Sequence, residues 1–394
     1  MTLVESEKSN SRIFSILLHT IFFLSGIATV LIGQVLPILT TKFGLNDLQA
    51  GYLFPAQFSG SILGTVATDW FGRRGKLALA ATIGSFGMAL GLIMMNVDSY
   101  AFCLVGFFVN GVGIGLTLPA INILILELNP LRAAAALSFL NFFWGAGAIL
   151  SKPFVDLTTT SGGIFLPTLI LALPLILFAI FLSIREKEPE AKFEKSGEAE
   201  SELAPIWSLP IAWMIALFHF IHVGFESGMG GWLTSYTERI ESPAAIGLLS
   251  PTLLYFLFFV IGRGTAPLFF RFLDENKMIF LSILVILAGM IVLLVASNIF
   301  ILSIGASVAG FGTSAIFPTN VSRFSRTFGE GAMRRAMPLF ICGTLGATAV
   351  TWLIGYVSDS TGSLRNGMTV LLASVVILLV IQIFLSLRKP LTKI

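Results

Sequence analysis

The chain has 394 residues, of which 56% are hydrophobic and 11% charged, with a formal net charge of +3 and a mean hydropathy of +0.92. Soluble domains carry about 25% charged residues, so this composition excludes a soluble globular protein. The only two cysteines, Cys103 and Cys342, lie in apolar segments and offer neither a disulfide framework nor a metal-binding cluster.

Twelve apolar segments have about the length at which a helix crosses a bilayer. Lipid offers backbone amides no hydrogen-bond partner, so continuous apolar segments predict helices rather than barrel strands. The predicted spans are 13–39, 48–68, 77–96, 99–124, 134–158, 163–184, 210–237, 244–267, 278–296, 299–322, 335–357 and 366–387. The polar residues 1–12 run into the first span, which predicts a short tail rather than a cleaved signal.

The basic residues predict the orientation of these spans. Of the 24 lysines and arginines, only Lys42, Arg239 and Arg365 fall in loops predicted to lie outside, and Lys152 and Arg263 fall within spans. All the others lie in inside loops or termini, which is the positive-inside pattern. We therefore expect a multi-pass protein of the plasma (inner) membrane with both termini in the cytoplasm.

The longest polar interval lies within residues 185–209 and has mixed charges, two prolines and no apolar periodicity. This composition predicts a solvated cytoplasmic linker between an N-terminal six-helix bundle, 1–184, and a C-terminal six-helix bundle, 210–394. We therefore predict an all-α membrane protein with twelve transmembrane helices in two six-helix bundles. Two halves of this kind suit a transporter built from parallel repeats.

The loop between the second and third spans reads Gly64-Thr-Val-Ala-Thr-Asp-Trp-Phe-Gly-Arg-Arg-Gly-Lys76. It resembles the signature loop of the major facilitator superfamily, in which an aspartate precedes glycine and paired basic residues. The resemblance implies a cytoplasmic gate, in which the aspartate accepts hydrogen bonds from an arginine one turn on and from a neighbouring helix start. The gate residues would be Asp69, Gly72, Arg73 and Arg74. The alternative is a charged turn that obeys the positive-inside rule.

Four further segments are similar to the fucose permease-like branch of this superfamily, which carries sugar–proton symporters. They are residues 35–51, 140–150, 222–233 and 310–319. The acidic residues that the bacterial fucose permease carries in its first and fourth spans correspond here to Gly33 and Ile114. Because both carboxylates are missing, neither fucose nor that coupling scheme is expected.

Several polar or aromatic side chains lie near the estimated midpoints of different spans, where a central solute site needs them. With Lys152, which lies nearer the outer surface, the candidate solute-binding residues are Gln57, Asn110, Asn141, Trp144, Glu226 and Tyr255. The alternative for each amide is a hydrogen bond between helices, on the order of 0.6 kcal/mol.

The seventh span carries two of the three histidines and a carboxylate. His219, His222 and Glu226 share one helical face, and an acidic residue in hydrocarbon is by default functional. We expect Glu226 to couple transport to H⁺ or Na⁺ with His222 as its partner, and His219 to be structural. The alternatives are a permanently neutral Glu226 bonded to a carbonyl, or a carboxylate that binds Na⁺ or the solute directly.

Two basic residues lie within predicted spans, and each is interpreted separately. Lys152 lies four residues before Asp156, which favours an i, i+4 ion pair, while the alternative is attraction of an anionic solute group. Arg263 is expected to snorkel or to cap a helix end.

These features predict a secondary transporter that moves a small polar solute, most of all a sugar, by alternating access. A carrier of an organic anion or amphiphile using Lys152 is the alternative. No metal cluster, catalytic triad or nucleotide-binding loop points to an enzyme. We expect no cofactor apart from a coupling H⁺ or Na⁺, no nucleic-acid partner, a solute and the lipid bilayer as partners, and a monomer.

Overall fold

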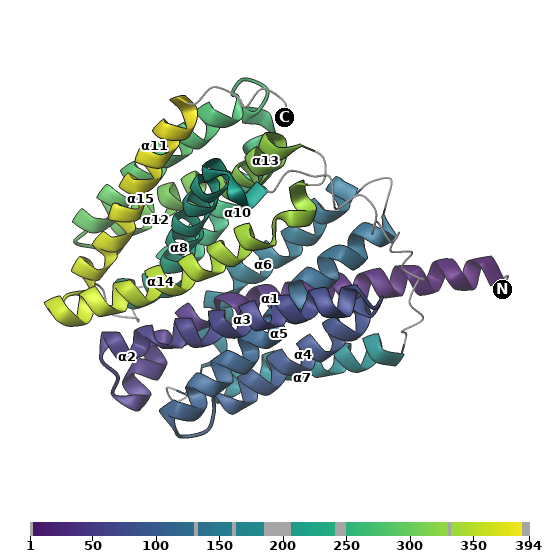
Figure 1. Ribbon diagram of the computed structural model, residues 1–394. Helices are drawn as coiled ribbons and strands as arrows, with labels where there is room; N and C mark the ends of the chain where they lie inside the picture. Colours follow the sequence, from purple (N-terminus) through teal and green to yellow (C-terminus); the bar gives the residue numbers. More distant parts are fainter. Residues whose placement is uncertain are drawn as a thin grey trace. The chain divides into compact units, whose positions relative to one another are not determined.

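The computed structural model describes residues 3–129, 133–159, 163–184, 206–240, 250–329 and 332–387. Within these ranges the chain is helical and has no β-strand (Figure 1). The predicted all-α class is therefore confirmed.

The chain divides into two compact units. The first consists of Met1–Phe43 and Ala56–Lys195, and the second of Gly44–Pro55 and Ser196–Ile394. Residues 185–205, which make up most of the predicted linker, lie outside the described residues. The transfer of residues 44–55 to the second unit was not anticipated, because the sequence suggested contiguous halves.

The helices that lie mainly in the first unit are α1 (Leu3–Phe43), α3 (Leu53–Gly72), α4 (Leu77–Met94), α5 (Tyr100–Leu128), α6 (Ala133–Thr158) and α7 (Phe165–Ile184). Those of the second unit are α2 (Asp47–Gly51), α8 (Pro210–Glu238), α10 (Pro251–Phe269), α11 (Glu275–Val295), α12 (Ile299–Thr313), α13 (Ile316–Phe328), α14 (Met337–Thr361) and α15 (Leu364–Leu387). Short 3₁₀ turns precede α8 and α14 at Ile206–Ser208 and Ala332–Arg335.

Ten helical stretches among the described residues are long and apolar enough to cross a membrane, with α12 and α13 counted as one. Helices α3 and α6 lie at the positions of the other two predicted spans. Residues 244–249 of the eighth predicted span lie outside the described part of the chain. Residues 3–12 of the predicted N-terminal tail are helical and continue α1.

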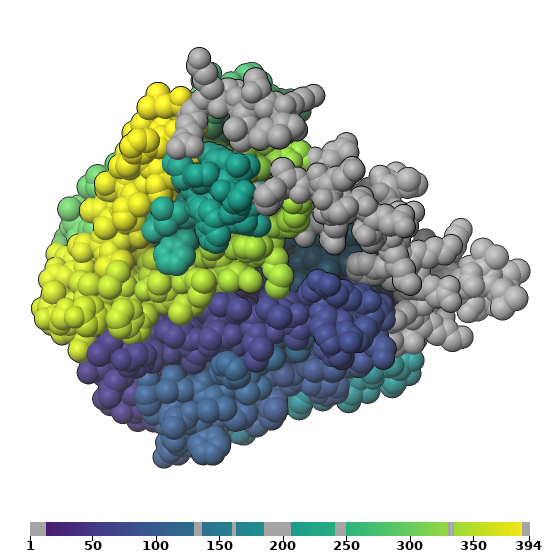
Figure 2. Space-filling model, viewed as in Figure 1, coloured from purple at the N-terminus to yellow at the C-terminus, as the bar shows by residue number. Residues whose placement is uncertain are grey.

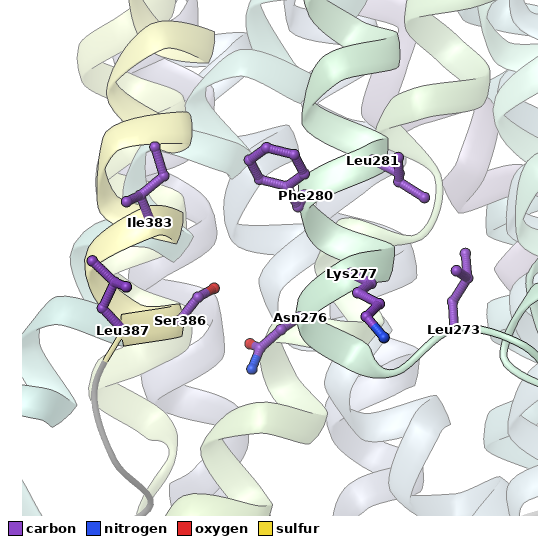
Figure 3. Close-up of a pocket in the computed structure, with 8 residues that line it drawn as sticks. All are labelled: Leu273, Asn276, Lys277, Phe280, Leu281, Ile383, Ser386 and Leu387. Carbon is purple, nitrogen blue, oxygen red and sulfur yellow. The ribbon is translucent and has the colours of Figure 1, made fainter.

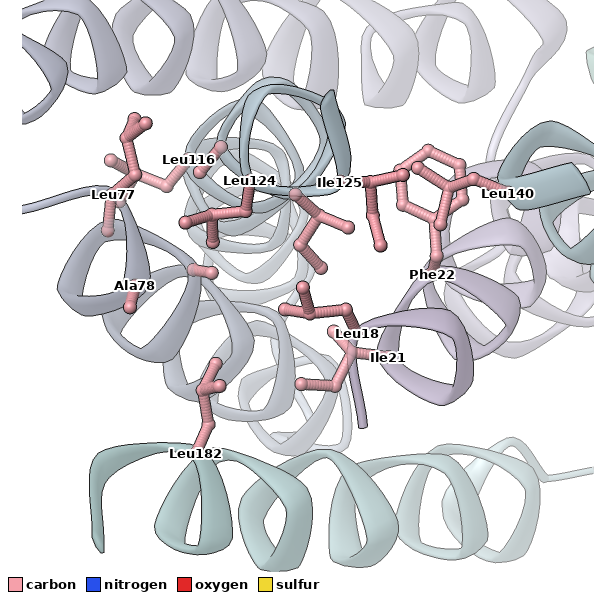
Figure 4. Packing of buried hydrophobic residues seen from close by; sticks show 14 residues of the cluster. Leu18, Ile21, Phe22, Leu77, Ala78, Leu116, Leu124, Ile125, Leu140 and Leu182 are labelled. Atoms are coloured by element: carbon pink, nitrogen blue, oxygen red, sulfur yellow. The ribbon is translucent and has the colours of Figure 1, made fainter. Parts of the chain in front are cut away.

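The first unit is held together by small residues and by an aliphatic core. An added Cβ on Gly113 would lie 2.3 Å from the backbone nitrogen of Met88, so α4 and α5 approach each other backbone to backbone. Beside this contact, Leu18, Ile21 and Leu182 of α1 and α7 belong to a fully buried cluster that also includes α4, α5 and α6 (Figure 4).

In the second unit, a glycine likewise allows the backbones of α8 and α14 to approach closely. A Cβ on Gly346 would lie 1.9 Å from the carbonyl oxygen of Phe220, which only glycine permits. Helix α15 packs against both α8 and α14, and Figure 2 shows the surfaces of α14 and α15 adjoining in yellow-green and yellow. Helix α15 also has exposed apolar side chains, including Val380 and Phe384, as expected where a helix meets lipid.

Helix α13 buries a charge that the sequence assigned to an inside loop. The guanidinium of Arg323 donates to Oε1 of Gln382 at 2.7 Å and to Oδ1 of Asn276 at 3.2 Å, and the residue is 8% exposed. The tenth predicted span ended at residue 322, whereas the helix continues to Phe328. Arg323 therefore joins α13 to α11 and α15 instead of facing solvent.

Candidate functional site

The centre of the candidate site is the pair on α8 that the sequence singled out. The side chain of His222 is fully buried, that of Glu226 is 21% exposed, and His222 Nε2 lies 3.6 Å from Glu226 Oε2. Neither His222 nitrogen, nor this Glu226 oxygen, has a hydrogen-bond partner within the described chain. Buried polar atoms are nearly always paired, so these atoms can accept or donate bonds to an ion, water or solute.

Helix α10 supplies the next side chains of this site, at i, i+4 and i+8. Tyr255 is fully buried and its ring stacks on Phe259, with 6.3 Å between the centroids. Its hydroxyl approaches Thr313 of α12 but makes no hydrogen bond of good geometry in the described structure. The Tyr255 hydroxyl is therefore another polar group available to a ligand.

Arg263 adds a cation to the same unit. Its guanidinium carbon lies 4.2 Å from the ring centroid of Phe259, and Nε donates to the carbonyl of Ser314 at 3.4 Å. Ser314 is the C-cap of α12, so the predicted helix-capping role fits the geometry. The charge of Arg263 also interacts electrostatically with the Glu226 carboxylate. No carboxylate among the described residues lies within 4 Å of the Arg263 guanidinium. The interaction between Arg263 and Glu226 was not predicted. Its sequence signal is a basic residue two turns beyond Tyr255 on α10.

His219 lies one turn before His222 and is 1% exposed. Its ring lies between two aromatic side chains, 5.0 Å from Phe317 and 6.0 Å from Phe340 by centroid distance. This packing agrees with the structural role expected for His219.

The polar candidates on α3 and α5 each bond to a neighbouring helix. Gln57 donates to the carbonyl of Thr29 on α1 at 3.0 Å, and Asn110 donates to Met88 on α4 at 3.3 Å. Both side chains are 1% exposed and each keeps an unpartnered oxygen. These contacts are hydrogen bonds between helices, the predicted alternative to solute binding for each amide.

The two candidates on α6 differ from each other. Asn141 is exposed and donates to the carbonyl of Leu137 in its own helix at 2.8 Å. Trp144 is half-buried, and its indole N–H has no partner among the described residues. Of the two, only Trp144 offers a polar atom without a protein partner.

Lys152 forms a short ion pair with Asp156 on the same helix, and its side chain is 10% exposed. This is the i, i+4 pair expected from the spacing. Its charge is therefore neutralised within α6, which weakens the case for Lys152 as an anion-binding residue.

The signature loop forms local contacts at the end of α3. Arg73 Nε donates to Asp69 Oδ2 at 2.9 Å, and Arg74 stacks over Trp70 at 3.8 Å. The side chains of Asp69 and Arg73 are both at least half exposed, and Gly72 ends the helix. Within the described ranges, no neighbouring helix start donates to Asp69, so the structure shows only the local part of the expected gate.

A groove elsewhere in the second unit has a volume of about 420 Å³ and contains none of the predicted site residues (Figure 3). It lies between the start of α11 and the end of α15. Its lining includes the apolar side chains of Phe280 and Ile383 and the polar side chain of Asn276. The described residues also contain no group of three side chains suited to a metal ion. Neither feature competes with the α8–α10 site.

Comparisons with known proteins agree with this architecture. Residues 18–340 match the sequence profile of the Major Facilitator Superfamily. The fold is similar to that of a D-xylose–proton symporter, with a TM-score of 0.79, 16% identity and coverage of 95% of this chain and 97% of that one. The E. coli fucose:proton symporter FucP gives a TM-score of 0.65 and 20% identity over 95% and 99% of the two chains.

Two curated relatives match shorter stretches. Polyol transporter 5 of Arabidopsis thaliana is 34% identical over 112 residues, which is 27% of this chain and 20% of that protein. The 4-hydroxybenzoate transporter PcaK of Pseudomonas putida is 31% identical over 127 residues, or 31% and 28% of the two chains. The match thus spans less than a third of each relative's length. The profile match covers most of the chain, and the protein belongs to the Major Facilitator Superfamily of multi-pass membrane transporters.

Proposed function

We propose that this transporter moves a small polar solute, with a sugar or polyol as the first candidate, by alternating access. The observation that carries the proposal is the group of unpartnered polar atoms on His222, Glu226 and Tyr255 inside an apolar helical unit. A hydroxyl-rich solute matches such a group, because it donates and accepts hydrogen bonds at once. The polyol and D-xylose transporters among the similar proteins support the same solute class.

Coupling to H⁺ or Na⁺ is proposed to run through Glu226. Its side chain is 21% exposed, whereas that of its partner His222 is fully buried, so Glu226 is the more accessible of the two groups to an ion. Acidic residues within membrane helices commonly mark ion or proton pathways. His222 is positioned to respond to the charge of Glu226 at 3.6 Å.

A second candidate solute is an organic acid, and Arg263 favours it. Its guanidinium lies against Phe259 without a close carboxylate among the described residues, an arrangement suited to a carboxylate on an aromatic ring. The 4-hydroxybenzoate transporter among the relatives supports this class. Lys152, the cation favoured by the sequence for this role, is already paired.

Uptake by proteoliposomes tests the proposal. The purified protein is reconstituted and offered labelled D-xylose, L-fucose, sorbitol, a nucleoside and 4-hydroxybenzoate, each with and without an inward H⁺ or Na⁺ gradient. Sugar or polyol uptake above that of protein-free liposomes supports the first candidate. Uptake of 4-hydroxybenzoate alone, lost in Arg263→Gln, transfers the assignment to the second. If no member of the panel enters or exchanges, the proposed solute classes are wrong.

A further inference from the structure

The groove between α11 and α15 has a polar end, where the two helices are joined. Asn276 and Lys277 lie in the first turn of α11, and Ser386 lies in the last turn of α15. The side-chain nitrogen of Gln382 on α15 donates to the carbonyl of Asn276 at 3.1 Å and to the hydroxyl of Ser386 at 3.0 Å. The side chains of Asn276, Lys277 and Ser386 are exposed and carry hydrogen-bond donors. We call these three residues the polar end of the groove.

The rest of the groove is apolar. Phe280, Leu281 and Ile383 lie one turn further into the two helices, and Figure 3 shows them above the polar end. Leu273 and Leu387 complete the lining. Helices α11 and α15 are long and apolar enough to cross a membrane, and the first three of these side chains are exposed. Because acyl chains are as apolar as leucine, this wall of the groove suits contact with lipid.

A buried cation lies directly behind the polar end. Nη2 of Arg323 on α13 donates to Oδ1 of Asn276 at 3.2 Å and to Gln382 at 2.7 Å. Nη1 of the same guanidinium has no partner among the described residues. Glu275, whose charge acts on Arg323, is itself paired with Arg326 at 3.1 Å. Within the described ranges, Arg323 therefore has no carboxylate of its own within 4 Å.

The chain around the polar end carries an excess of positive charge. The segment 271–277 and helix α13 together contain four basic and two acidic residues. They are Arg271, Lys277, Arg323 and Arg326, and Asp274 and Glu275. Lys277 is paired with Asp274 at 3.3 Å, but both side chains are more than half exposed, and surface pairs of this kind contribute little in water. Lys277 is therefore able to bind a second anion.

We propose that the groove binds one anionic phospholipid, with its phosphate at the polar end and an acyl chain along Phe280, Leu281 and Ile383. The sequence predicts that the loop before α11 lies inside, so the lipid would belong to the cytoplasmic leaflet. Basic pockets between transmembrane helices on that side bind lipid head groups. The groove volume of about 420 Å³ lies within the usual range for ligand sites. The site does not depend on which solute is transported.

Native mass spectrometry of the delipidated full-length protein in detergent measures this binding. Phosphatidylglycerol and phosphatidylcholine with identical acyl chains are titrated, so that the comparison isolates the charge of the head group. The parent should bind the first phosphatidylglycerol more tightly than phosphatidylcholine, and Lys277→Gln should weaken only the phosphatidylglycerol affinity, by about fivefold. Lys76→Gln removes another exposed lysine, in a loop of the first unit, and should leave both affinities unchanged.

A second pair of variants tests the apolar wall. Ile383→Trp fills the groove without changing a charge and should weaken phosphatidylglycerol binding, whereas Ile377→Trp, on the same helix but outside the groove lining, should not. All four substituted positions are exposed, so without lipid the variants should unfold at the midpoint of the parent.

Three results would refute the site. They are equal affinities of the parent for the two lipids, equal losses in Lys277→Gln and Lys76→Gln, and unchanged phosphatidylglycerol binding in Ile383→Trp. If phosphatidylglycerol binds only after residues 388–394 are removed, the occupant is the chain's own C-terminal segment and the lipid assignment is wrong.

Discussion

Arg323 provides a sharp test of the packing of the second unit, because Arg326 lies three residues away on the same helix in a different setting. Arg323 is buried and donates to side-chain oxygens of Gln382 and Asn276. Arg326 is 73% exposed in its side chain and pairs with Glu275 at 3.1 Å. Substitution of each arginine by glutamine removes one positive charge from the same helix.

The expected costs differ because the two environments differ. A hydrogen bond to a charged group contributes about 1.5–3 kcal/mol, and Arg323→Gln removes two of them. Gln382 is fully buried in the parent protein, so its oxygen loses a charged partner inside the unit. One nitrogen of Arg323 has no partner among the described residues, which offsets part of the loss. We expect Arg323→Gln to lower the free energy of unfolding by about 3 kcal/mol and Arg326→Gln by less than about 1 kcal/mol.

Thermal unfolding of the purified variants in detergent measures this difference. For a unit of this size, 1 kcal/mol corresponds to a shift of about 2–4 °C in the unfolding midpoint. Arg323→Gln should therefore lower the midpoint by roughly 6–12 °C, and Arg326→Gln by a few degrees at most. Equal shifts for the two variants would contradict the buried three-helix contact.

Three other outcomes follow from the structure. Gly346→Ala should destabilise the protein, because its Cβ would lie 1.9 Å from a backbone carbonyl of α8. Gly264→Ala, which has no atom within 4 Å, should not destabilise it. Equal midpoints of the two variants in thermal unfolding would contradict this contact. Lys152→Gln should leave the solute affinity in uptake assays unchanged. It should lower the unfolding midpoint slightly, because Asp156 loses its partner. A loss of solute affinity would instead support a solute-binding role for Lys152. Because the pKa of Asp47 is lowered, its stabilising pair with Arg239 is complete above the usual carboxyl pKa of about 3.9 and is lost as the pH falls through the lowered value. The difference in unfolding midpoint between the parent protein and Asp47→Asn should therefore be the same from about pH 8 to 5, and a difference that shrinks near pH 6 would contradict the ionised pair.

Features that depend on local sequence could be predicted well. Each predicted span overlaps a helix, because apolar length alone requires a helix in lipid, although several helix ends differ from the predicted ones. The pairs Lys152–Asp156 and His222–Glu226 follow from i, i+4 spacing on one helix, and both are present. The family resemblance rested on a contiguous motif, and the match over residues 18–340 confirms it.

Features that depend on how a helix is rotated in its unit could not be predicted. Gln57 and Asn110 are buried in the first unit, yet their amide nitrogens bond to neighbouring helices. The position of a residue along its helix can be predicted, but the neighbour that its side chain contacts depends on the rotation of the helix. The contact between Asp47 and Arg239, 192 residues apart, was out of reach for the same reason.

The measurement that tests the central claim most directly is solute accumulation in proteoliposomes under an inward H⁺ or Na⁺ gradient. For a solute identified from the panel, the parent protein should concentrate it inside, and Glu226→Gln should still exchange it across the membrane but no longer accumulate it. Glu127→Gln, an exposed acid near the end of α5, serves as the matched control and should behave like the parent. Gradient-driven accumulation that is unchanged in Glu226→Gln would contradict the proposed coupling role of the α8 site.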